Sequence, residues 1–467
     1  MAFRVSFFGG ADAVTGSEFL VESGDTRILI DCGIEQGKDF CESCMYDEFP
    51  YDLERITAVV VTHAHLDHIG RVPKLVKDGY TGPIYMTEPT RDIADVMLRD
   101  SAHIMSENAK AKQLPPLYLE EHVNKMLSQI EVVEYRKEVK VGSMSMMLRD
   151  TGHILGGASV RLKDGEGDTI AFTSDIGNSP TPLLPDAEAI TDADVVVIES
   201  VYGDRANPEK EHRVEKFRDT VKAAIARKGP ILIPAFSVER TQLMLYELSN
   251  LMEVGALPRI PVFLDSPLAI AVTDIYKKHA AKYFKDAAQD ELKREHDLFA
   301  FPFLKMTPSR EESQQIVDTK DPKIIIAGAG MSHGGRIGKW EKMFLPKPQT
   351  TLIMVGYQAP GSPGRLLQDG SQKVKIAGQL VEVRAKVETL HGWSGHADRD
   401  GLLRFADSCV PSAKTFFVAM GEPSSARFLA QRIHDFLGVR AIVAGKNEVW
   451  EVSKKEVTRQ EVRGDIR

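Results

Sequence analysis

The sequence predicts an α/β protein built as two domains. Its 467 residues exceed the about 250–300 that a single hydrophobic core usually serves. Between about residues 205 and 385, short apolar runs typical of strands alternate with helical patterns, for example 231–234, 239–252 and 262–264. Apolar strands separated by helices indicate a parallel sheet with helices on both faces. This middle part is therefore predicted to be an α/β unit of its own.

The segments before and after the middle part predict further sheet structure. Strands are expected at 4–8, 18–22, 27–30, 56–61, 169–173, 195–198 and 414–419, and helices at 71–77 and 90–112. Several of these strands end directly before a histidine or a carboxylate. Candidate site residues are therefore expected at the strand ends.

Composition limits the class of protein. The chain is 43% hydrophobic and 27% charged, as in a soluble globular protein. No apolar run approaches the about 20 residues that a membrane span needs, and no basic segment followed by an apolar signal core opens the chain. We therefore predict a cytoplasmic protein without a membrane segment. The net charge of -8 argues against a generally basic nucleic-acid binder, but it leaves room for a local basic groove.

The strongest chemical signal is the segment Thr62–His68, which holds three histidines and one aspartate directly after an apolar strand. His63 and His65 are two residues apart and can converge on one ion. Asp67 and His68 project differently and could hold a second. Imidazole and carboxylate together suit Zn²⁺ or a similar divalent metal, so the segment predicts a metal site.

Four further residues lie at strand ends. His153 stands between glycines and could complete the shell of the first metal, and Asp175 is placed to bridge two metals. Asp31 and Glu199 each follow an apolar strand, where a carboxylate is either an ordinary turn residue or part of a site. Only together with the histidine segment do these residues form a series.

Two glycine-rich loops in the middle part could contact an anion, because backbone N–H groups before a helix bind phosphate. One loop contains Gly334 and Gly335 and ends at Arg336, and the other ends at Arg365. Such loops are also ordinary turns. Further along, Ser394 and His396 precede a helical pattern, so they join the candidate residues.

In their order along nearly the whole chain, these residues resemble the β-CASP subfamily of metallo-β-lactamase-fold nucleases. This subfamily includes the pre-mRNA 3′-end processing endonuclease and its bacterial and archaeal relatives. The resemblance implies an αββα sandwich formed by residues 1–204 and 386–467, with an α/β β-CASP domain inserted at 205–385. Motifs that carry it include Asp31, the His63–His68 segment, His153, Asp175, Glu199-Ser200-Val201-Tyr202-Gly203, Pro234-Ala235-Phe236, Asp265-Ser266-Pro267 and Ser394-Gly395-His396-Ala397-Asp398.

The resemblance also implies roles and a function. Two zinc ions are expected, the first held by His63, His65, His153 and Asp175, and the second by Asp67, His68 and Asp175. Asp31 resembles the acid that orients the histidine loop, and Glu199 with His396 resembles the pair that handles the leaving group. Substrate contacts are expected at Ser394, Gly334, Gly335, Arg336 and Arg365. The implied activity is hydrolysis of single-stranded RNA by a metal-activated hydroxide, as an endonuclease with 5′-to-3′ exonuclease trimming as an option.

One departure from the family pattern is Met420, which stands where the family usually has a histidine ligand of the second metal. A thioether is a poor substitute on Zn²⁺, so we expect that site to be weaker. Three explanations stay open: three protein ligands suffice, His333 or His391 compensates, or the chain is an altered homologue that binds RNA without efficient turnover. A small-molecule ester or thioester hydrolase is the other alternative function. The sequence leaves the oligomeric state open, with a homodimer among the alternatives.

Overall fold

A computed structural model describes residues 2–35, 43–207, 209–332, 334–356, 358–359 and 361–460. The chain divides into two compact units: a first unit of Met1–Ala206 with His396–Arg467, and a second unit of Asn207–Gly395. The second unit ends ten residues later than the sequence predicts, at 395 instead of 385. The reason is that strand β19 (Lys386–Thr389) pairs with β16 (Thr351–Met354) of the second unit.

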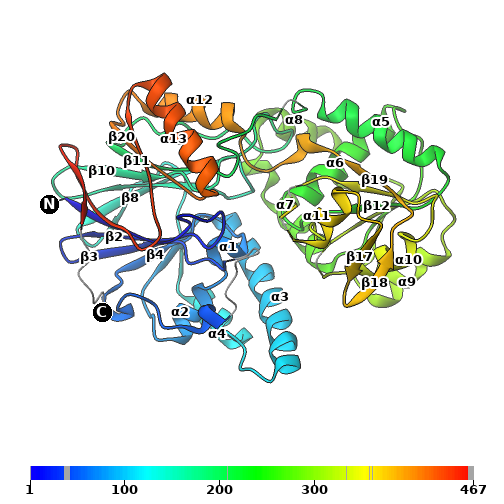
Figure 1. Cartoon of the computed structure of the whole chain (residues 1–467), viewed down its shortest axis with the longest axis horizontal. Coiled ribbons are helices and arrows are strands. Elements are labelled where there is room, and N and C mark those ends of the chain that lie inside the picture. Colours follow the sequence, from blue (N-terminus) through cyan, green and yellow to red (C-terminus); the bar gives the residue numbers. More distant parts are fainter. Residues whose placement is uncertain are drawn as a thin grey trace. The chain divides into compact units, whose positions relative to one another are not determined.

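The first unit contains two sheets (Figure 1). The first sheet has the strand order β23 (Val457–Gln460), β22 (Val449–Val452), β1 (Phe3–Gly9), β2 (Glu18–Ser23), β3 (Thr26–Ile30), β4 (Ala58–Val60), β5 (Ile84–Met86) and β6 (Ile130–Val132). The second has the order β21 (Arg440–Val443), β20 (Thr415–Ala419), β11 (Val195–Glu199), β10 (Thr169–Phe172), β9 (Ala158–Lys163), β8 (Met144–Asp150) and β7 (Val139–Val141).

Helices cover the outer faces of both sheets (Figure 1). They are α1 (Leu66–Ile69), α2 (Val72–Lys77), α3 (Glu88–Lys112) and α4 (Glu120–Ser128) on the side of the first sheet, and α12 (Arg399–Cys409) and α13 (Pro423–Leu437) on the side of the second. The described residues also form short 3₁₀ helices: η1 (Ser43–Tyr46), η2 (Leu53–Arg55) and, in the second unit, η3 (His391–Trp393). The first unit is therefore an αββα sandwich, which confirms the predicted fold class.

Strand β11 shows why the central strands read as unbroken apolar runs. Val195 and Val197 belong to the core between the two sheets. Val196 and Ile198 belong to the core under α12 and α13. Successive side chains of a strand point to opposite faces, so a strand that is covered on both faces must be apolar at every position.

The second unit is built on a six-stranded sheet in which all recorded strand pairs are parallel. Its order is β14 (Leu304–Met306), β13 (Val262–Leu264), β15 (Ile324–Ala327), β12 (Ile231–Pro234), β16 and β19. The helices are α5 (Arg213–Ala226), α6 (Arg240–Glu253), α7 (Pro267–Tyr283), α8 (Asp286–Glu295), α9 (Arg310–Asp318), α10 (Ile337–Phe344) and α11 (Pro363–Gln368), and a hairpin consists of β17 (Lys373–Ile376) and β18 (Gln379–Glu382). The predicted parallel α/β unit is thus confirmed.

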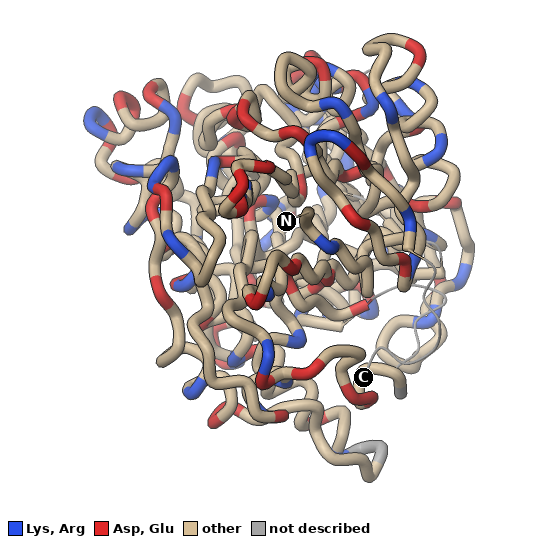
Figure 2. Tube along the Cα trace, turned by 90° about the vertical axis from the view of Figure 1, so that its left-hand side faces the viewer, with Lys and Arg blue, Asp and Glu red and all other residues tan. Residues whose placement is uncertain are grey.

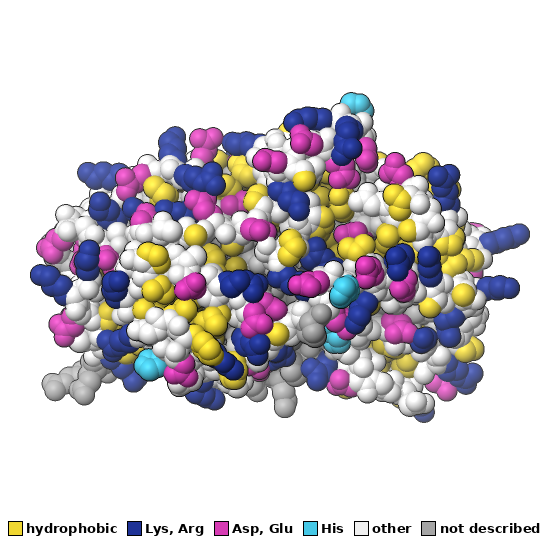
Figure 3. Space-filling model, turned by 90° about the horizontal axis from the view of Figure 1, so that it is seen from above, with side chains coloured by type: hydrophobic (Ala, Val, Ile, Leu, Met, Phe, Trp, Pro, Cys, Tyr) yellow, Lys and Arg dark blue, Asp and Glu magenta, His cyan; other side chains and the backbone are white. Residues whose placement is uncertain are grey.

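Surface charge is mixed in sign. Along the trace in Figure 2, Lys and Arg positions are interspersed with Asp and Glu positions. Figure 3 shows the same interspersion of basic and acidic side chains over the face drawn. Within the described residues, no helix is long and apolar enough to cross a membrane. On these views, charge is not gathered into one basic band.

Candidate metal centre

The histidine segment begins where β4 ends. Strands β3 and β4 run parallel, so their carboxyl ends lie at the same edge of the first sheet. Asp31 follows β3, and the segment Thr62–His68 follows β4. The Asp31 N–H donates to the Val60 carbonyl at 2.9 Å, which joins the two strand ends. His63 is buried and His65 is half-buried at the residue before α1. The fold therefore carries the histidines on a short turn anchored by two strands.

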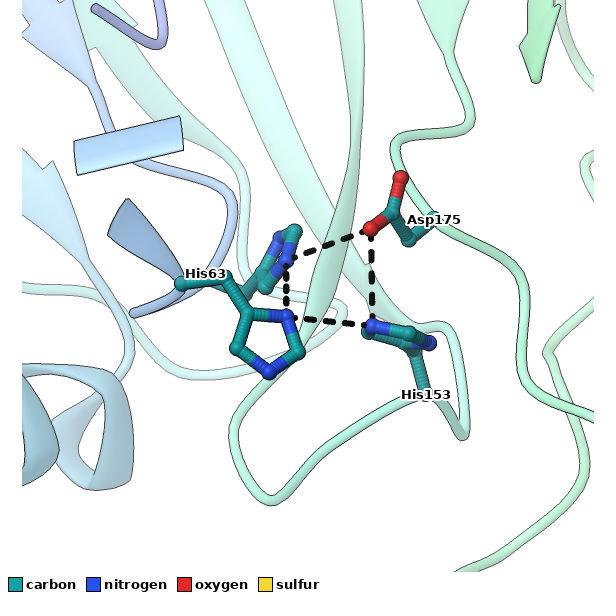
Figure 4. Close-up of side chains that lie close together, drawn as sticks. His63, His153 and Asp175 are labelled. Carbon is teal, nitrogen blue, oxygen red and sulfur yellow. Dashed lines mark hydrogen bonds and ion pairs between the residues drawn. The ribbon is translucent and has the colours of Figure 1, made fainter. Parts of the chain in front are cut away.

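Four side chains from distant parts of the chain converge here: His63, His65, His153 and Asp175 (Figure 4). His63 Nε2 lies 3.1 Å from His65 Nδ1, and His153 Nε2 lies 3.3 Å from the same atom. Asp175 Oδ2 lies 3.4 Å from both His63 Nε2 and His153 Nε2. These atoms are the lone-pair donors of their side chains, and they face one common point.

The four atoms lie close enough together to hold one metal ion. Ligand atoms placed about 2.0–2.1 Å from a tetrahedral ion lie about 3.3–3.4 Å from one another. Four of the six separations among the ligand atoms run from 3.1 to 3.4 Å, and all six lie within 4.8 Å. Three imidazoles and one carboxylate form a donor set that divalent metals accept. The residues present therefore fit one metal ion.

The protonation state of the histidines also suits metal binding. Burial lowers the pKa of His63, and it lowers the pKa of His65 and His153 well below the usual value. Neutral imidazole is the form that binds a metal. For Asp175, burial acts to raise the pKa, but the neighbouring charges of His68 and His396 outweigh it and hold the pKa well below the usual value. The cluster thus presents neutral nitrogens and one carboxylate.

Asp31 contacts the histidine segment through Thr62 and His68. Its carboxylate accepts hydrogen bonds from the Thr62 N–H at 2.8 Å, the Thr62 hydroxyl at 2.9 Å and the Ser17 hydroxyl at 3.2 Å. It also lies 2.7 Å from His68 Nδ1. This contact turns the other nitrogen, His68 Nε2, toward Asp175 Oδ2 at 3.5 Å. Asp31 therefore orients His68 and does not join the four-atom cluster.

The residues predicted for a second metal are only partly brought together. His68 reaches Asp175, as described above. Asp67 is half-buried in the first turn of α1, and its charge contributes to raising the pKa of His396. Within the described residues, the second group with metal-ligand spacing consists of Asp175, Glu199 and His396. Asp175 is common to both groups, so it links the two sets of ligand-type side chains.

Met420 is buried at the end of β20, with a positive φ of 48°. Its sulfur lies 4.0 Å from the Ser17 hydroxyl, and its N–H donates to the Gly10 carbonyl at 2.5 Å. It also belongs to the core between the two sheets. Of the residues suggested as substitutes, His391 lies in the second unit, outside both ligand groups found among the described residues. His333 lies outside the described residues.

Glu199 and His396 form a buried pair beside the metal cluster. Glu199 ends β11 and is fully buried, and its Oε1 accepts from the Ile176 N–H at 2.6 Å and lies 3.4 Å from His396 Nδ1. Burial raises the pKa of Glu199. For His396, burial acts to lower the pKa, but the Glu199 and Asp175 carboxylates outweigh it and raise it to about 9. The pair keeps a proton on His396 at neutral pH.

The residues predicted to contact substrate belong to the second unit, and Ser394 among them stands two residues before His396 in the sequence. Arg336 donates to Asp265 at 2.7 Å and to the backbone carbonyls of Thr307 and Pro308, each at 2.6 Å. This geometry favours a structural role for Arg336. Arg365 pairs with Asp369 at 2.9 Å and stays partly exposed. Gly334 and Gly335 have positive φ angles of 88° and 63°, and Ser394 follows η3.

Sequence reasoning missed the hydroxyls that support the ligands. The Ser174 hydroxyl donates to the Thr62 hydroxyl at 2.7 Å, and both oxygens lie within 3.3 Å of His63 Nδ1. Each of these residues directly precedes a ligand in the sequence, at His63 and Asp175. That position next to a ligand is the signal that could have found them.

Fold and site together define a metallo-hydrolase. Three family models match the chain: the metallo-beta-lactamase superfamily at residues 12–235, the Beta-Casp domain at 241–367, and the Zn-dependent metallo-hydrolase RNA specificity domain at 380–444. The chain belongs to the β-CASP family of the metallo-β-lactamase superfamily, as the resemblance predicts.

Named relatives agree with this assignment. The chain is 36% identical to ribonuclease TTHA0252 of Thermus thermophilus over 86% of this chain and 90% of that one. It is 32% identical to the transcription termination factor FttA of Methanosarcina mazei over 93% of this chain and 69% of that one. A crystal structure of a protein of unknown function from Enterococcus faecalis matches with a TM-score of 0.56 and 12% identity, over 97% and 100% of the two chains. That last likeness shows the fold alone.

Proposed function

We propose that this protein is a metal-dependent ribonuclease that hydrolyses phosphodiester bonds of single-stranded RNA. The observation that carries the proposal is the convergent set of His63, His65, His153 and Asp175 with the Glu199–His396 pair attached to it through Asp175. The ribonuclease among the relatives and the RNA specificity model support RNA as the substrate. An RNA substrate also supports the predicted cytoplasmic location.

We further propose zinc as the resident metal. Three imidazoles and one carboxylate at the observed spacing suit Zn²⁺, which favours tetrahedral nitrogen and oxygen ligands. A second ion would lie near His68, Asp67 and Asp175, the acid shared by both ligand groups. Because Met420 offers only a buried thioether, this second ion would bind more weakly than the first.

When bound, the metal ions supply an activated water and positive charge that offsets the charge of the phosphate. The chain's own residues then have separate tasks. Asp175 stays ionised and holds the imidazoles of His63 and His153 in place. As the bond between phosphorus and the 3′-oxygen breaks, His396 donates its Nε2 proton to that oxygen. Glu199 contacts Nδ1 of the same ring and so leaves Nε2 to face the substrate. Because the oxygen of water becomes bonded to phosphorus and the 3′-oxygen leaves with a proton, the products carry a 5′-phosphate and a 3′-hydroxyl.

A direct test is metal content per chain, by mass spectrometry, together with cleavage of a labelled single-stranded RNA. The proposal expects at least one zinc per chain and cutting that chelators abolish and zinc restores. Circular and linear RNA substrates distinguish endonuclease from exonuclease activity. Ester and thioester substrates should stay intact. Turnover of those substrates without RNA cleavage would instead establish a small-molecule hydrolase.

Met420→His tests the second ion. The position has a positive φ, which histidine adopts more readily than most residues. We expect Met420→His to raise the zinc content toward two and to increase the cleavage rate, whereas the control Met343→His in α10 changes neither. The buried Met420 favours a second candidate function, an RNA-binding protein with little turnover. RNA binding without cleavage in the original chain, and cleavage only in Met420→His, would establish that alternative.

A further inference from the structure

Phe236 is an aromatic side chain left exposed at the carboxyl edge of the parallel sheet of the second unit. It follows β12 by two residues, and it is 37% exposed, whereas its neighbours Ala235 and Val238 are 1% and 3% exposed. Its backbone position is fixed, because the Phe236 carbonyl accepts from the Thr241 N–H at 3.2 Å and from the Thr241 hydroxyl at 2.8 Å. The exposure therefore belongs to an anchored residue.

The ring lies against the backbone of the loops that follow β15 and β16. A Cβ built on Gly330 would lie 3.0, 2.8 and 2.9 Å from the consecutive ring carbons Cγ, Cδ2 and Cε2. Near-equal distances to three consecutive atoms place that point over the face of the ring and not beyond its edge. A Cβ on Gly356 would lie 3.5 Å from Cε2. Only glycine at position 330 allows this contact, so the loop is shaped to support the ring.

The support itself is held in place. Gln358 is buried, and its side-chain N–H donates to the Gly330 carbonyl at 2.9 Å. Behind this loop, the hydroxyls of Ser237 and Ser266 lie 3.6 Å from the Cβ position of Gly328. One face of the Phe236 ring is thus backed by fixed backbone, while 37% of the residue stays exposed to a ligand.

A flat aromatic ring that is supported by backbone and partly exposed is suited to a nucleobase. Open α/β sheets bind ligands at the carboxyl ends of their strands, and bases of single-stranded nucleic acid stack on aromatic side chains with little dependence on sequence. A phenylalanine needed only for packing would be buried, as most phenylalanines of this chain are. We propose that Phe236 is a stacking platform for one base of the single-stranded RNA, an inference that rests on the proposed function.

The test compares Phe236→Leu and Phe236→Tyr in the full-length, metal-loaded protein. The probes are a labelled single-stranded RNA with phosphorothioate linkages and a matched strand that lacks its bases. Leucine keeps the apolar contact but removes the aromatic face, so RNA binding should weaken by about 5- to 100-fold. Tyrosine should bind as the original chain does. The strand without bases should bind the original chain and Phe236→Leu equally.

The matched control is Phe436→Leu in α13 of the first unit, where Phe436 is 62% exposed; RNA affinity should not change. Thermal unfolding of each variant confirms that it is folded. Equal RNA affinity of Phe236→Leu and the original chain would overturn the inference while leaving RNA cleavage intact. RNA binding that depends on Phe236 without any cleavage would instead remove the nuclease proposal and keep the platform. Failure of the original chain to bind RNA at all would overturn both, and a Phe236 effect confined to a protein partner would mark the residue as a protein contact.

Discussion

Asp31 in the first unit and Asp265 in the second unit look alike in the sequence but have different roles in the structure. Each follows an apolar strand, and each is almost fully buried, at 1% and 0% exposure. Asp31 accepts from neutral donors of Thr62 and Ser17 and contacts the imidazole of His68. The charge of Asp31 therefore acts on His68, a residue that faces Asp175 of the metal cluster.

Asp265 accepts from the hydroxyls of Thr307 and Ser313 at 2.9 Å each, from Trp340 Nε1 at 2.8 Å and from Arg336 at 2.7 Å. A guanidinium stays charged at any relevant pH, so the carboxylate is permanently neutralised and nothing is left for a ligand. A buried strand-end acid is therefore functional or structural according to its partner. That partner lies 37 residues away for Asp31 and 71 for Asp265.

The largest expected effect concerns the acid shared by both ligand groups. Asp175→Asn keeps the shape of the side chain but removes the charge that faces His63, His68 and His153. We expect RNA cleavage to fall by about 10⁴-fold, the scale seen when one member of a catalytic group is removed. Zinc content should fall as well. Cleavage within tenfold of the original rate would show that the cluster is not the reaction centre.

Asn substitutions at the two buried acids test the comparison directly. Asp265→Asn leaves Arg336 without its charged partner and should lower the free energy of unfolding by about 3–5 kcal/mol, with unchanged zinc content per folded chain. Asp31→Asn should lower metal affinity by about 10- to 100-fold, as loss of a residue behind a ligand does. Denaturant unfolding and zinc titration measure the two effects. The comparison fails if both variants change the same quantity.

A pH dependence is expected in the second unit from Glu341, whose carboxyl is fully buried in α10 and accepts from the Ser332 hydroxyl at 2.5 Å. Burial raises its pKa from 4.5 to about 7. The folded state therefore holds the proton more tightly than the unfolded state, and stability declines as pH rises from about 4.5 through 7.

Glu341→Gln removes this titration. At pH 8 the variant should be more stable than the original chain, by as much as about 3 kcal/mol, and at pH 5 the two should nearly coincide. Denaturant unfolding at both pH values measures the difference. The matched control is Glu311→Gln, at an exposed position of α9, which should show no such dependence. An equal gain at both pH values would contradict the burial argument.

Much of the fold could be predicted because the central strands carry strong local patterns. The strands at 231–234 and 262–264 are found where the sequence predicts them. Helix α8 was not predicted, because only Ala288 of its ten residues is buried and few of its residues are apolar. The second unit extends to 395 and not 385 because β19 pairs with β16, which is a tertiary contact. No local pattern reports such a contact.

The candidate site divides in the same way. The histidine segment could be predicted as a metal site from the sequence alone, since four potential ligands lie within six residues. The position of Ser174 directly before Asp175 marks it as a candidate, but its contact with His63 is a tertiary one between residues 111 apart in the sequence. Arg336 was predicted to meet substrate from its place at the end of a glycine loop, yet its donors go to Asp265 and to backbone carbonyls. The sequence of a loop that ends in arginine does not show whether a buried carboxylate elsewhere in the fold binds that arginine.

Arg365 is the counterpart of Arg336 and carries the smallest expected effect on stability. It pairs with Asp369 one helical turn away, and 43% of its side chain is exposed. Such a pair contributes only about 0.3–0.5 kcal/mol, so Arg365→Ala should change the free energy of unfolding by no more than this. Because the guanidinium is not held by a buried acid, it remains available to a phosphate. If it meets RNA, the variant should bind RNA more weakly, with a salt dependence lower by about 0.7 in the logarithmic slope. An unchanged slope would mean that neither arginine-ended loop contacts the substrate through its arginine, and that the second unit recognises RNA through groups other than these two.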